Sequence, residues 1–437
     1  MDERPGVSGS ARALFISAPA SGQGKTTVTA AIARHARNRG WRVRVFKTGP
    51  DFIDPMILER ACGAPVYSLD LWMGGEADCR RQLYGAAAEA DLLLIEGVMG
   101  LYDGSPSSAD LAQQFGVPIA AVIDGNAMAQ TFGAVALGLR QYRPGLAFHG
   151  VMANRVAGNY HATLLEGSVS GIQPPLRFLG ALQQEAGVAI ADRHLGLLQA
   201  AEIADLDARL DLAASAIGGS VNLEEIPTVE FPPAPDVALP PLLAGVRIAV
   251  ARDEALSFIY AANLDVLQRL GARLQFFSPV KDPRLPPADA VYLPGGYPEL
   301  HAAQLAANHP LHTALRQHVS AGKPLLAECG GMMCLFEHLI DAAGTRHRMA
   351  GALPGETAMQ KQLQGLSHQS VAFPGGELRG HTFHHSRLST SLSASRQGRT
   401  QDGREGEAVF TLGRLTASYI HFYWPSNPLV AASLFSP

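Results

Sequence analysis

The chain has 437 residues, more than one ordinary domain needs, which favours two domains. Hydrophobic residues make up 47% and charged residues 17% of it, a composition typical of globular proteins. The formal net charge of −4 at pH 7 gives no sign of a nucleic-acid or membrane surface. The four cysteines lack metal-ligand spacing and the first residues lack an apolar signal core, so we expect a cytoplasmic protein with reduced thiols.

Apolar segments alternate with helical patterns through the first half of the chain. Strands are expected at 11–18, 41–49, 90–97, 117–124 and 147–156, and helices at 25–40 and 127–142. Strands that are apolar throughout and separated by helices predict a parallel sheet that is covered on both faces.

The second half shows the same alternation after a proline-rich stretch, residues 226–244, which predicts an interdomain linker. Strands are expected at 245–253, 272–279, 289–296 and 323–331, and a helix at 258–271. The predicted fold class is therefore α/β, with a phosphate-loop parallel-sheet domain at 1–225 followed by a flavodoxin-like domain at 245–437. Residues 388–407, rich in Ser, Arg and Gly, predict an exposed, mobile loop.

A phosphate-binding loop is predicted between the first strand and the first helix. The stretch SAPASGQGKTTVTA fits G-x-x-x-x-G-K-[ST] except that Pro19 replaces the first glycine. Lys25 would neutralise the β- and γ-phosphates of ATP, and the Thr26 hydroxyl would ligate Mg²⁺. A plain glycine-containing turn is the alternative. The predicted nucleotide-binding residues are Gly22, Gln23, Gly24, Lys25, Thr26, Thr27 and Asn154.

Charged side chains follow two strands of this half at their carboxyl ends, where open α/β sheets bind ligands. They are Lys47, Asp51, Asp54, Glu96 and Asp103. Ordinary turn roles for the aspartates and a buried ion pair for Glu96 are the alternatives. The Asn154 amide, also at a strand end, would either form hydrogen bonds with the edge of the adenine base or close a turn.

Cys329 stands between an apolar strand and a glycine pair in LLAECGGMM. A strand–turn–helix elbow of this kind presents a nucleophile, and a helix N-terminus behind it favours the thiolate. Gly330 and Gly296 would supply backbone N–H groups to an oxyanion. His421, at the end of an apolar strand, is the predicted base, with the cluster at 381–385 as the alternative source. A buried structural thiol is the competing interpretation of Cys329.

The segments LPGGYPE and ECGGM and the late histidine give the second half a resemblance to class I glutamine amidotransferase domains. The family's usual acid two residues after the histidine is absent, because Tyr423 stands there. GHTFHHS resembles the G-H-E-F-H-Y-S stretch of corrinoid amidases, with Thr382 in place of Glu. The third triad member is therefore either supplied elsewhere or missing.

The first half resembles dethiobiotin synthetase, and the whole chain resembles the cobyrinic and hydrogenobyrinic acid a,c-diamide synthase family. PDFIDP, IEGVMGLYDG, RHLGL and ECGGM carry that resemblance in order. It implies that ATP phosphorylates the c and then the a carboxylate of a corrin-type ring, and that ammonia from L-glutamine displaces each phosphate. It also implies that Thr26, Asp51 and Glu96 hold Mg²⁺, while Asp54 and Asp103 orient the substrate.

The compact length favours metal-free hydrogenobyrinic acid as the substrate, with cobalt-containing cobyrinic acid as the alternative. Analogy with the first-domain family makes a homodimer the expected assembly. A different class stays open as well, a phosphate-loop regulatory ATPase that carries a non-catalytic glutaminase-like module.

Overall fold

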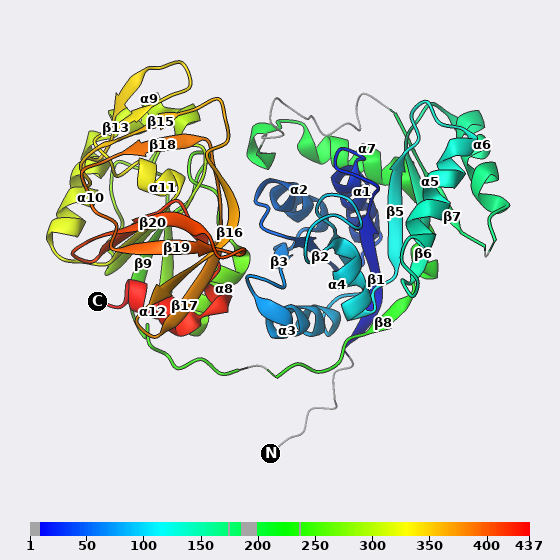
Figure 1. The fold of residues 1–437 in the computed structure, drawn as a ribbon, viewed down its shortest axis with the longest axis horizontal. Coiled ribbons are helices and arrows are strands. Elements are labelled where there is room, and N and C mark those ends of the chain that lie inside the picture. Colours follow the sequence, from blue (N-terminus) through cyan, green and yellow to red (C-terminus); the bar gives the residue numbers. More distant parts are fainter. Residues whose placement is uncertain (1–8, 174, 185–198, 236) are drawn as a thin grey trace. The chain divides into compact units, whose positions relative to one another are not determined.

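The computed structural model describes residues 9–173, 175–184, 199–235 and 237–437. The chain divides into two compact units (Figure 1). The first comprises Met1–Leu71 and Gly75–Asp236, and the second comprises Trp72–Gly74 and Val237–Pro437. Among the described residues, no helix combines the length and apolarity that a bilayer span requires.

The first unit is built on a parallel sheet in the order β3-β2-β4-β1-β5-β6-β7, with β8 antiparallel to the start of β1. All predicted strands of this half are present. The strands are β1 (Ser10–Ser17), β2 (Val43–Thr48), β3 (Tyr67–Leu69), β4 (Leu92–Glu96), β5 (Ile119–Asp124), β6 (Phe148–Val156), β7 (Phe178–Gln183) and β8 (Thr228–Glu230).

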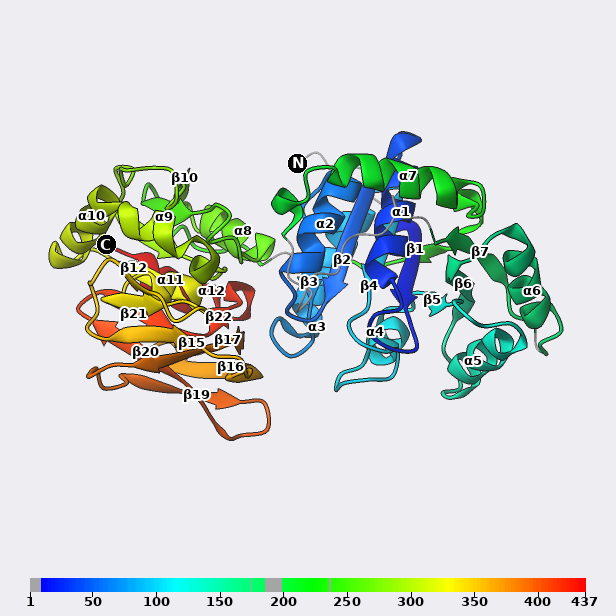
Figure 2. The same cartoon turned by 90° about the horizontal axis from the view of Figure 1, so that it is seen from above.

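Helices cover both faces of this sheet, as the apolar strands require. Alternate residues of β1 show the division, because Leu14 packs with α1, α2 and α7 whereas Phe15 packs with α3 and α4. Helices α5 and α6 pack on β5 and β6 (Figure 2). The helices are α1 (Lys25–Asn38), α2 (Ile53–Cys62), α3 (Gly75–Ala87), α4 (Ser108–Phe115), α5 (Gln130–Gln141), α6 (Asn159–Ser170) and α7 (Leu206–Gly218).

The second unit has a mixed sheet in the order β10-β9-β11-β12-β21-β20-β19-β16-β17-β22, and its first five strands are parallel. A smaller sheet has the order β14-β13-β15-β18. The strands are β9 (Arg247–Ala251), β10 (Arg273–Phe277), β11 (Ala290–Leu293), β12 (Leu325–Glu328), β13 (His338–Ile340), β14 (Arg346–Arg348), β15 (Glu356–Met359), β16 (Gly365–Phe373), β17 (Gly376–His384), β18 (Ser386–Ser389), β19 (Arg396–Thr400), β20 (Glu405–Leu412), β21 (Leu415–Ser418) and β22 (His421–Phe422).

Helices also cover both faces of the parallel part of this sheet, which confirms the predicted flavodoxin-like core. Helices α8 (Ala261–Arg269) and α12 (Pro428–Phe435) pack against one face. Helices α9 (Ala302–Ala307), α10 (His309–Ser320) and α11 (Gly330–Met333) pack against the other.

The prediction of a mobile loop at 388–407 is wrong. This segment contains the end of β18, all of β19 and the start of β20, and β19 and β20 pair antiparallel. Many of its side chains are exposed, so the pairing is specified by backbone hydrogen bonds and leaves little hydrophobic alternation to detect. The predicted linker, 226–244, includes β8, and the two units divide within it at Asp236.

Candidate functional site

The predicted phosphate loop lies between β1 and α1, at the carboxyl edge of the first unit's sheet. Gly22 and Gly24 have φ angles of 78° and 88°, in the left-handed region that other residues rarely adopt. A Cβ on Gly24 would also lie only 1.9 Å from Nδ2 of Asn154. Both the turn and the close approach of β6 therefore require glycine at this position.

Side chains from the ends of β5 and β6 hold this loop in place. Nδ2 of Asn154 donates to the carbonyl of Gln23 at 2.9 Å, and Oε1 of Gln23 accepts from the N–H of Asp124 at 2.9 Å. Arg155 donates to the carbonyl of Gly22 at 2.9 Å and to Oδ2 of Asp124 at 2.6 Å. The Asn154 amide thus positions the loop, and its contact with adenine stays a prediction.

Lys25 joins the phosphate loop to the loop that follows β4. Its Nζ donates to the carbonyl of Met99 at 2.6 Å and to that of Ala20 at 3.2 Å. Burial lowers the pKa of Lys25, and the charge of Lys47 lowers it further, while the charge of Glu96 opposes both. The ammonium is therefore held by neutral carbonyl oxygens and not by a carboxylate of its own.

Five of the predicted residues form one cluster around the Lys47 ammonium. Oε1 of Glu96 accepts from Nζ of Lys47 at 2.6 Å and from Oγ1 of Thr26 at 2.9 Å. Lys47 Nζ also lies 2.6 Å from Oδ2 of Asp54 and 3.6 Å from Oδ2 of Asp51. Burial lowers the pKa of Lys47, but the three carboxylate charges outweigh it and raise the pKa well above its ordinary value.

The two aspartates of this cluster differ in their protonation. Burial raises the pKa of Asp51 to about 7, and the charge of Asp54 adds to that rise. Burial also opposes ionisation of Asp54, but the charge of Lys47 and its hydrogen bond outweigh burial, so the pKa of Asp54 is lowered. Asp51 Oδ1 also accepts from the N–H of Ile53 at 2.9 Å. Near neutrality one carboxyl of the pair therefore retains much of its proton and the other is ionised.

The other predicted residues of the first unit lie at the same edge. Oδ2 of Asp103 accepts from the N–H of Gly100 at 3.0 Å, and the charge of Asp103 opposes the lowering of the pKa of Lys25. Thr27 is partly buried in the first turn of α1. The RHLGL segment, 193–197, lies outside the described residues.

The oxygen atoms at the end of β4 fit a magnesium ion. Oε2 of Glu96 is buried without a hydrogen-bond partner, and the Thr26 hydroxyl lies at the other carboxylate oxygen. Mg²⁺ prefers such hard oxygen ligands. Metal binding by Asp51 would release a proton because of its raised pKa. Over the described ranges, no three His, Cys, Asp or Glu side chains are arranged around one metal position, so the fit rests on Glu96 with Thr26.

Cys329 lies on a sharp turn between β12 and α11 in the second unit. Its φ of 43° and ψ of −109° place it in a conformation that is strained for a residue with a Cβ. A Cβ on Gly331 would lie 2.2 Å from the carbonyl of Leu293, so the elbow packs against β11 only because glycine follows. Such a strained elbow favours a nucleophile over a plain buried thiol.

The two predicted oxyanion donors come from adjacent segments. A Cβ on Gly330 would lie 3.0 Å from the backbone nitrogen of Gly296, so these two glycines approach closely beside the elbow. Two neighbouring backbone N–H groups are the usual donors to a tetrahedral oxyanion. The arrangement supports that role, which stays a prediction.

His421 begins the short strand β22, whereas we expected it to end a strand. Its ring lies against Gly295, where a Cβ would be 2.1 Å from Cε1. Burial lowers the pKa of His421 to about 3, and the charge of His384 acts in the same direction. Burial, with the charge of Glu299, raises the pKa of Cys329. In this state the thiol and the imidazole are therefore both neutral.

Two glutamates that were not predicted as site residues make hydrogen bonds near this elbow. Oε1 of Glu328 accepts from the N–H of Phe422 at 3.2 Å, and its Oε2 accepts from the Tyr292 hydroxyl at 2.8 Å. Burial raises the pKa of Glu328 to about 8. Glu407 pairs with His384 at 3.0 Å. Glu328 could have been predicted from the sequence, because it directly precedes Cys329. No sequence pattern indicates a role for Glu407.

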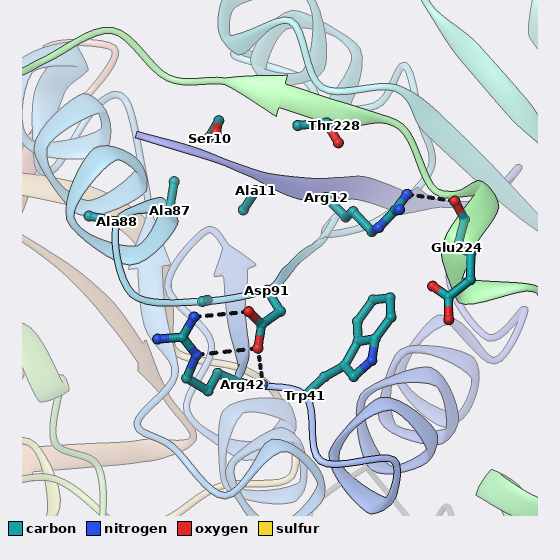
Figure 3. Close-up of a pocket in the computed structure, with 11 residues that line it drawn as sticks. Ser10, Ala11, Arg12, Trp41, Arg42, Ala87, Ala88, Asp91, Glu224 and Thr228 are labelled. Carbon is teal, nitrogen blue, oxygen red and sulfur yellow. Dashed lines mark hydrogen bonds and ion pairs between the residues drawn. The ribbon is translucent and has the colours of Figure 1, made fainter. Parts of the chain in front are cut away.

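A surface cavity of about 570 Å³ lies at the opposite edge of the first unit's sheet (Figure 3). Its polar groups bind one another, since Arg42 pairs with Asp91 at 2.9 Å and Arg12 donates to the carbonyl of Glu224 at 2.6 Å. Parallel sheets bind ligands at the carboxyl ends of their strands, which are not at this edge. The cavity is therefore not the candidate site.

Comparisons with known proteins match both halves. Residues 14–197 match the CobQ/CobB/MinD/ParA nucleotide binding domain, and residues 247–429 match the CobB/CobQ-like glutamine amidotransferase domain. The chain is 58% identical to a protein of Stutzerimonas stutzeri named hydrogenobyrinate a,c-diamide synthase, over 97% of this chain and 98% of that one.

Two further relatives cover nearly the full length. A Pseudomonas aeruginosa protein with the same name is 58% identical, over 97% of each chain. A Herminiimonas arsenicoxydans protein named cobyrinate a,c-diamide synthase is 51% identical, over 98% of this chain and 97% of that one.

Proposed function

The chain belongs to the family of hydrogenobyrinate and cobyrinate a,c-diamide synthases, and from this premise we propose that it amidates the a and c carboxylates of hydrogenobyrinic acid. ATP and L-glutamine are the co-substrates. The observation that carries the proposal is the presence, on one chain, of a Lys47–Glu96–Thr26 cluster beside a phosphate loop and of a strained Cys329 elbow.

Glutamine hydrolysis takes place in the second unit. Cys329 Sγ attacks the side-chain amide carbon of glutamine while neutral His421 accepts the thiol proton. The N–H groups of Gly296 and Gly330 stabilise the oxyanion, and the proton on His421 passes to the leaving ammonia. Water then hydrolyses the thioester to glutamate. Burial lowers the pKa of His421, so its ring is unprotonated at neutral pH and has a nitrogen free of a proton, but the same burial makes it a weak base.

Activation of the substrate carboxylate takes place in the first unit. The carboxylate attacks the γ-phosphorus of ATP, ADP leaves, and ammonia displaces phosphate from the resulting acyl phosphate. Lys25 and Lys47 provide fixed positive charge for the transferred phosphoryl group, and Asp54 and Asp103 orient the substrate. Glu96, Thr26 and Asp51 would hold Mg²⁺, which would supply positive charge to the ATP phosphates.

The substrate assignment follows the two relatives at 58% identity, both of which are named for the metal-free ring. Cobyrinic acid is the alternative, because the relative at 51% identity is named for it. We further infer a cytoplasmic enzyme, consistent with four free cysteines, and a homodimer.

The test is mass spectrometry of the products formed from hydrogenobyrinic acid and, in parallel, from cobyrinic acid, with ATP, Mg²⁺ and glutamine. Two amidations on the metal-free ring and few on the cobalt ring are expected. Two amidations on the cobalt ring alone would reverse the substrate assignment. Glutamate release without amidation of either ring would refute both substrates.

A further inference from the structure

A histidine–carboxylate pair lies in the second unit, outside the residues predicted for catalysis. Nε2 of His384, in β17, lies 3.0 Å from Oε1 of Glu407, in β20. Nδ1 of the same ring lies 2.8 Å from the carbonyl oxygen of Ser386. His384 is buried, and the Glu407 side chain is 23% exposed, so the pair is shielded from most of the solvent.

The two contacts determine how many protons the ring carries. A carbonyl oxygen has no proton to donate, and an ionised carboxylate has none either, so both ring nitrogens must be donors. His384 beside ionised Glu407 is therefore an imidazolium. A ring with two N–H groups cannot accept a proton, so His384 does not serve as the base in place of His421.

This ring is stacked on the residue that adjoins the Cys329 elbow. The rings of His384 and Tyr419 are 3.7 Å apart and inclined by only 7°. Ser418, the residue before Tyr419, accepts the backbone N–H of Cys329 at 2.8 Å. Sγ of Cys329 lies 4.0 Å from the carbonyl of Phe383, the residue before His384.

The neighbouring strand leaves room for the pair. Gly365, in β16, is in register with His384. A Cβ there would lie 2.6 Å from Nε2 of His384 and 2.8 Å from Oε1 of Glu407. Real Cβ atoms essentially never make contacts that short, so the pair requires glycine at residue 365.

We propose that Glu407 and His384 are a positioning pair of the glutaminase site, in which Glu407 holds His384 as an imidazolium beside Cys329. The His384 cation balances the charge of Glu407, one of the three glutamates whose charges raise the pKa of Cys329, and the pair does not touch glutamine. The proposal rests on glutamine hydrolysis at Cys329.

The thiol lies among more acids than bases. The charges of Glu299, Glu328 and Glu407 all raise the pKa of Cys329. The His384 cation is close enough to lower the pKa of His421. Of the other titratable groups here, Tyr419 interacts with the charge of Cys329, and His421 interacts with His384.

A charge-compensation cycle in the full-length protein tests the pair. The variants are His384→Gln, Glu407→Gln and the double variant. Alkylation of Cys329 by iodoacetamide is followed against pH by peptide mass spectrometry, because only the thiolate reacts. In His384→Gln the Glu407 charge is no longer compensated, so alkylation should move to higher pH by about one unit. In the double variant that charge is gone, and the profile should return toward that of the wild type.

Glutamine hydrolysis gives a second readout. Glu407→Gln should lower kcat by about tenfold with KM nearly unchanged, while Glu407→Asp should retain most of the activity. Asp341→Asn is the matched control, because it removes the carboxylate from another histidine pair of this unit, 2.9 Å from Nε2 of His347. Amidation with ammonium chloride in place of glutamine should be unchanged in every variant.

The outcomes separate the proposal from the function on which it rests. A double variant that is shifted as far as His384→Gln, or a wild-type profile in all three variants, would overturn the positioning pair. If His384→Gln does not fold, an unchanged kcat in Glu407→Gln would overturn it equally. A wild-type protein that releases no glutamate would instead refute the proposed glutaminase activity. The alkylation profiles of the three variants would then still test the effect of the pair on Cys329.

Discussion

Replacing Lys47 by methionine should destabilise the first unit through its buried charges. The Nζ of Lys47 lies 2.6 Å from Glu96, 2.6 Å from Asp54 and 3.6 Å from Asp51, and the side chain is almost fully buried. Methionine fills a similar volume without charge. Removing one partner of a buried ion pair costs about 3–5 kcal/mol, because the remaining charge keeps its desolvation penalty.

The loss of stability in Lys47→Met should increase with pH. Without the ammonium, the carboxylates next to it lose their counter-charge, so the folded state of the variant favours their protonated forms. Stability that comes from such protonation is present at low pH and is lost as pH rises. The difference between wild type and Lys47→Met should therefore be large at pH 8 and small at pH 5.

Hydrogen–deuterium exchange on peptides of β2 and β4 is the suitable assay, since a two-domain chain need not unfold in one transition. A cost of about 3 kcal/mol makes exchange by unfolding on the order of a hundredfold faster. Arg39→Met is the control. Its ion pair with Glu224, at 2.9 Å, has both side chains about half exposed and should contribute under about 1 kcal/mol. Equal exchange in Lys47→Met and wild type at pH 8 would refute the buried-charge argument.

Three further predictions concern other parts of the chain. Glu328→Gln should become more stable relative to wild type as pH rises from about 4.5 to about 8, and the difference should stay level above that. The reason is that the raised pKa of Glu328 makes its ionisation costly in the folded state and not in the unfolded state. Urea unfolding at several pH values measures the difference. Asp54→Asn and Asp103→Asn should spare glutamate release but reduce diamide formation, and wild-type amidation in either would contradict the substrate role. Gly24→Ala should abolish ATP binding by calorimetry, since its Cβ would meet Asn154, while glutamine hydrolysis persists.

Local patterns predicted most strands in the parallel parts of both sheets, but they missed β3, β7 and β21. Their strands are apolar on both faces, as in residues 92–96 and 119–124, and such runs bounded by helical periodicity have few other interpretations. Strand β19, which lies between β16 and β20, shows the opposite case. It is rich in arginine and glycine, and its structure comes from pairing with β16 and β20, which no pattern within 396–400 reveals.

The candidate site divides in the same way. Residues that belong to a strand end or a tight turn were found from the sequence, because the turn itself demands a particular type, as glycine at 24 or the elbow at Cys329 does. Glu407 was missed, because its significance depends on His384, which lies 23 residues away on a strand that is not adjacent to its own.

The sequence by itself therefore determined the α/β class, the phosphate loop, the nucleophile elbow and the resemblance to a family of diamide synthases. Each of these is encoded in a short run of residues whose backbone or charge requirement is local. Only the tertiary structure decided that Lys47 lies among three carboxylates, that Asn154 holds the loop, and that Glu407 pairs with His384. Those arrangements bring together side chains from strands that are far apart in the sequence, and sequence spacing alone does not predict which of them meet in the folded chain.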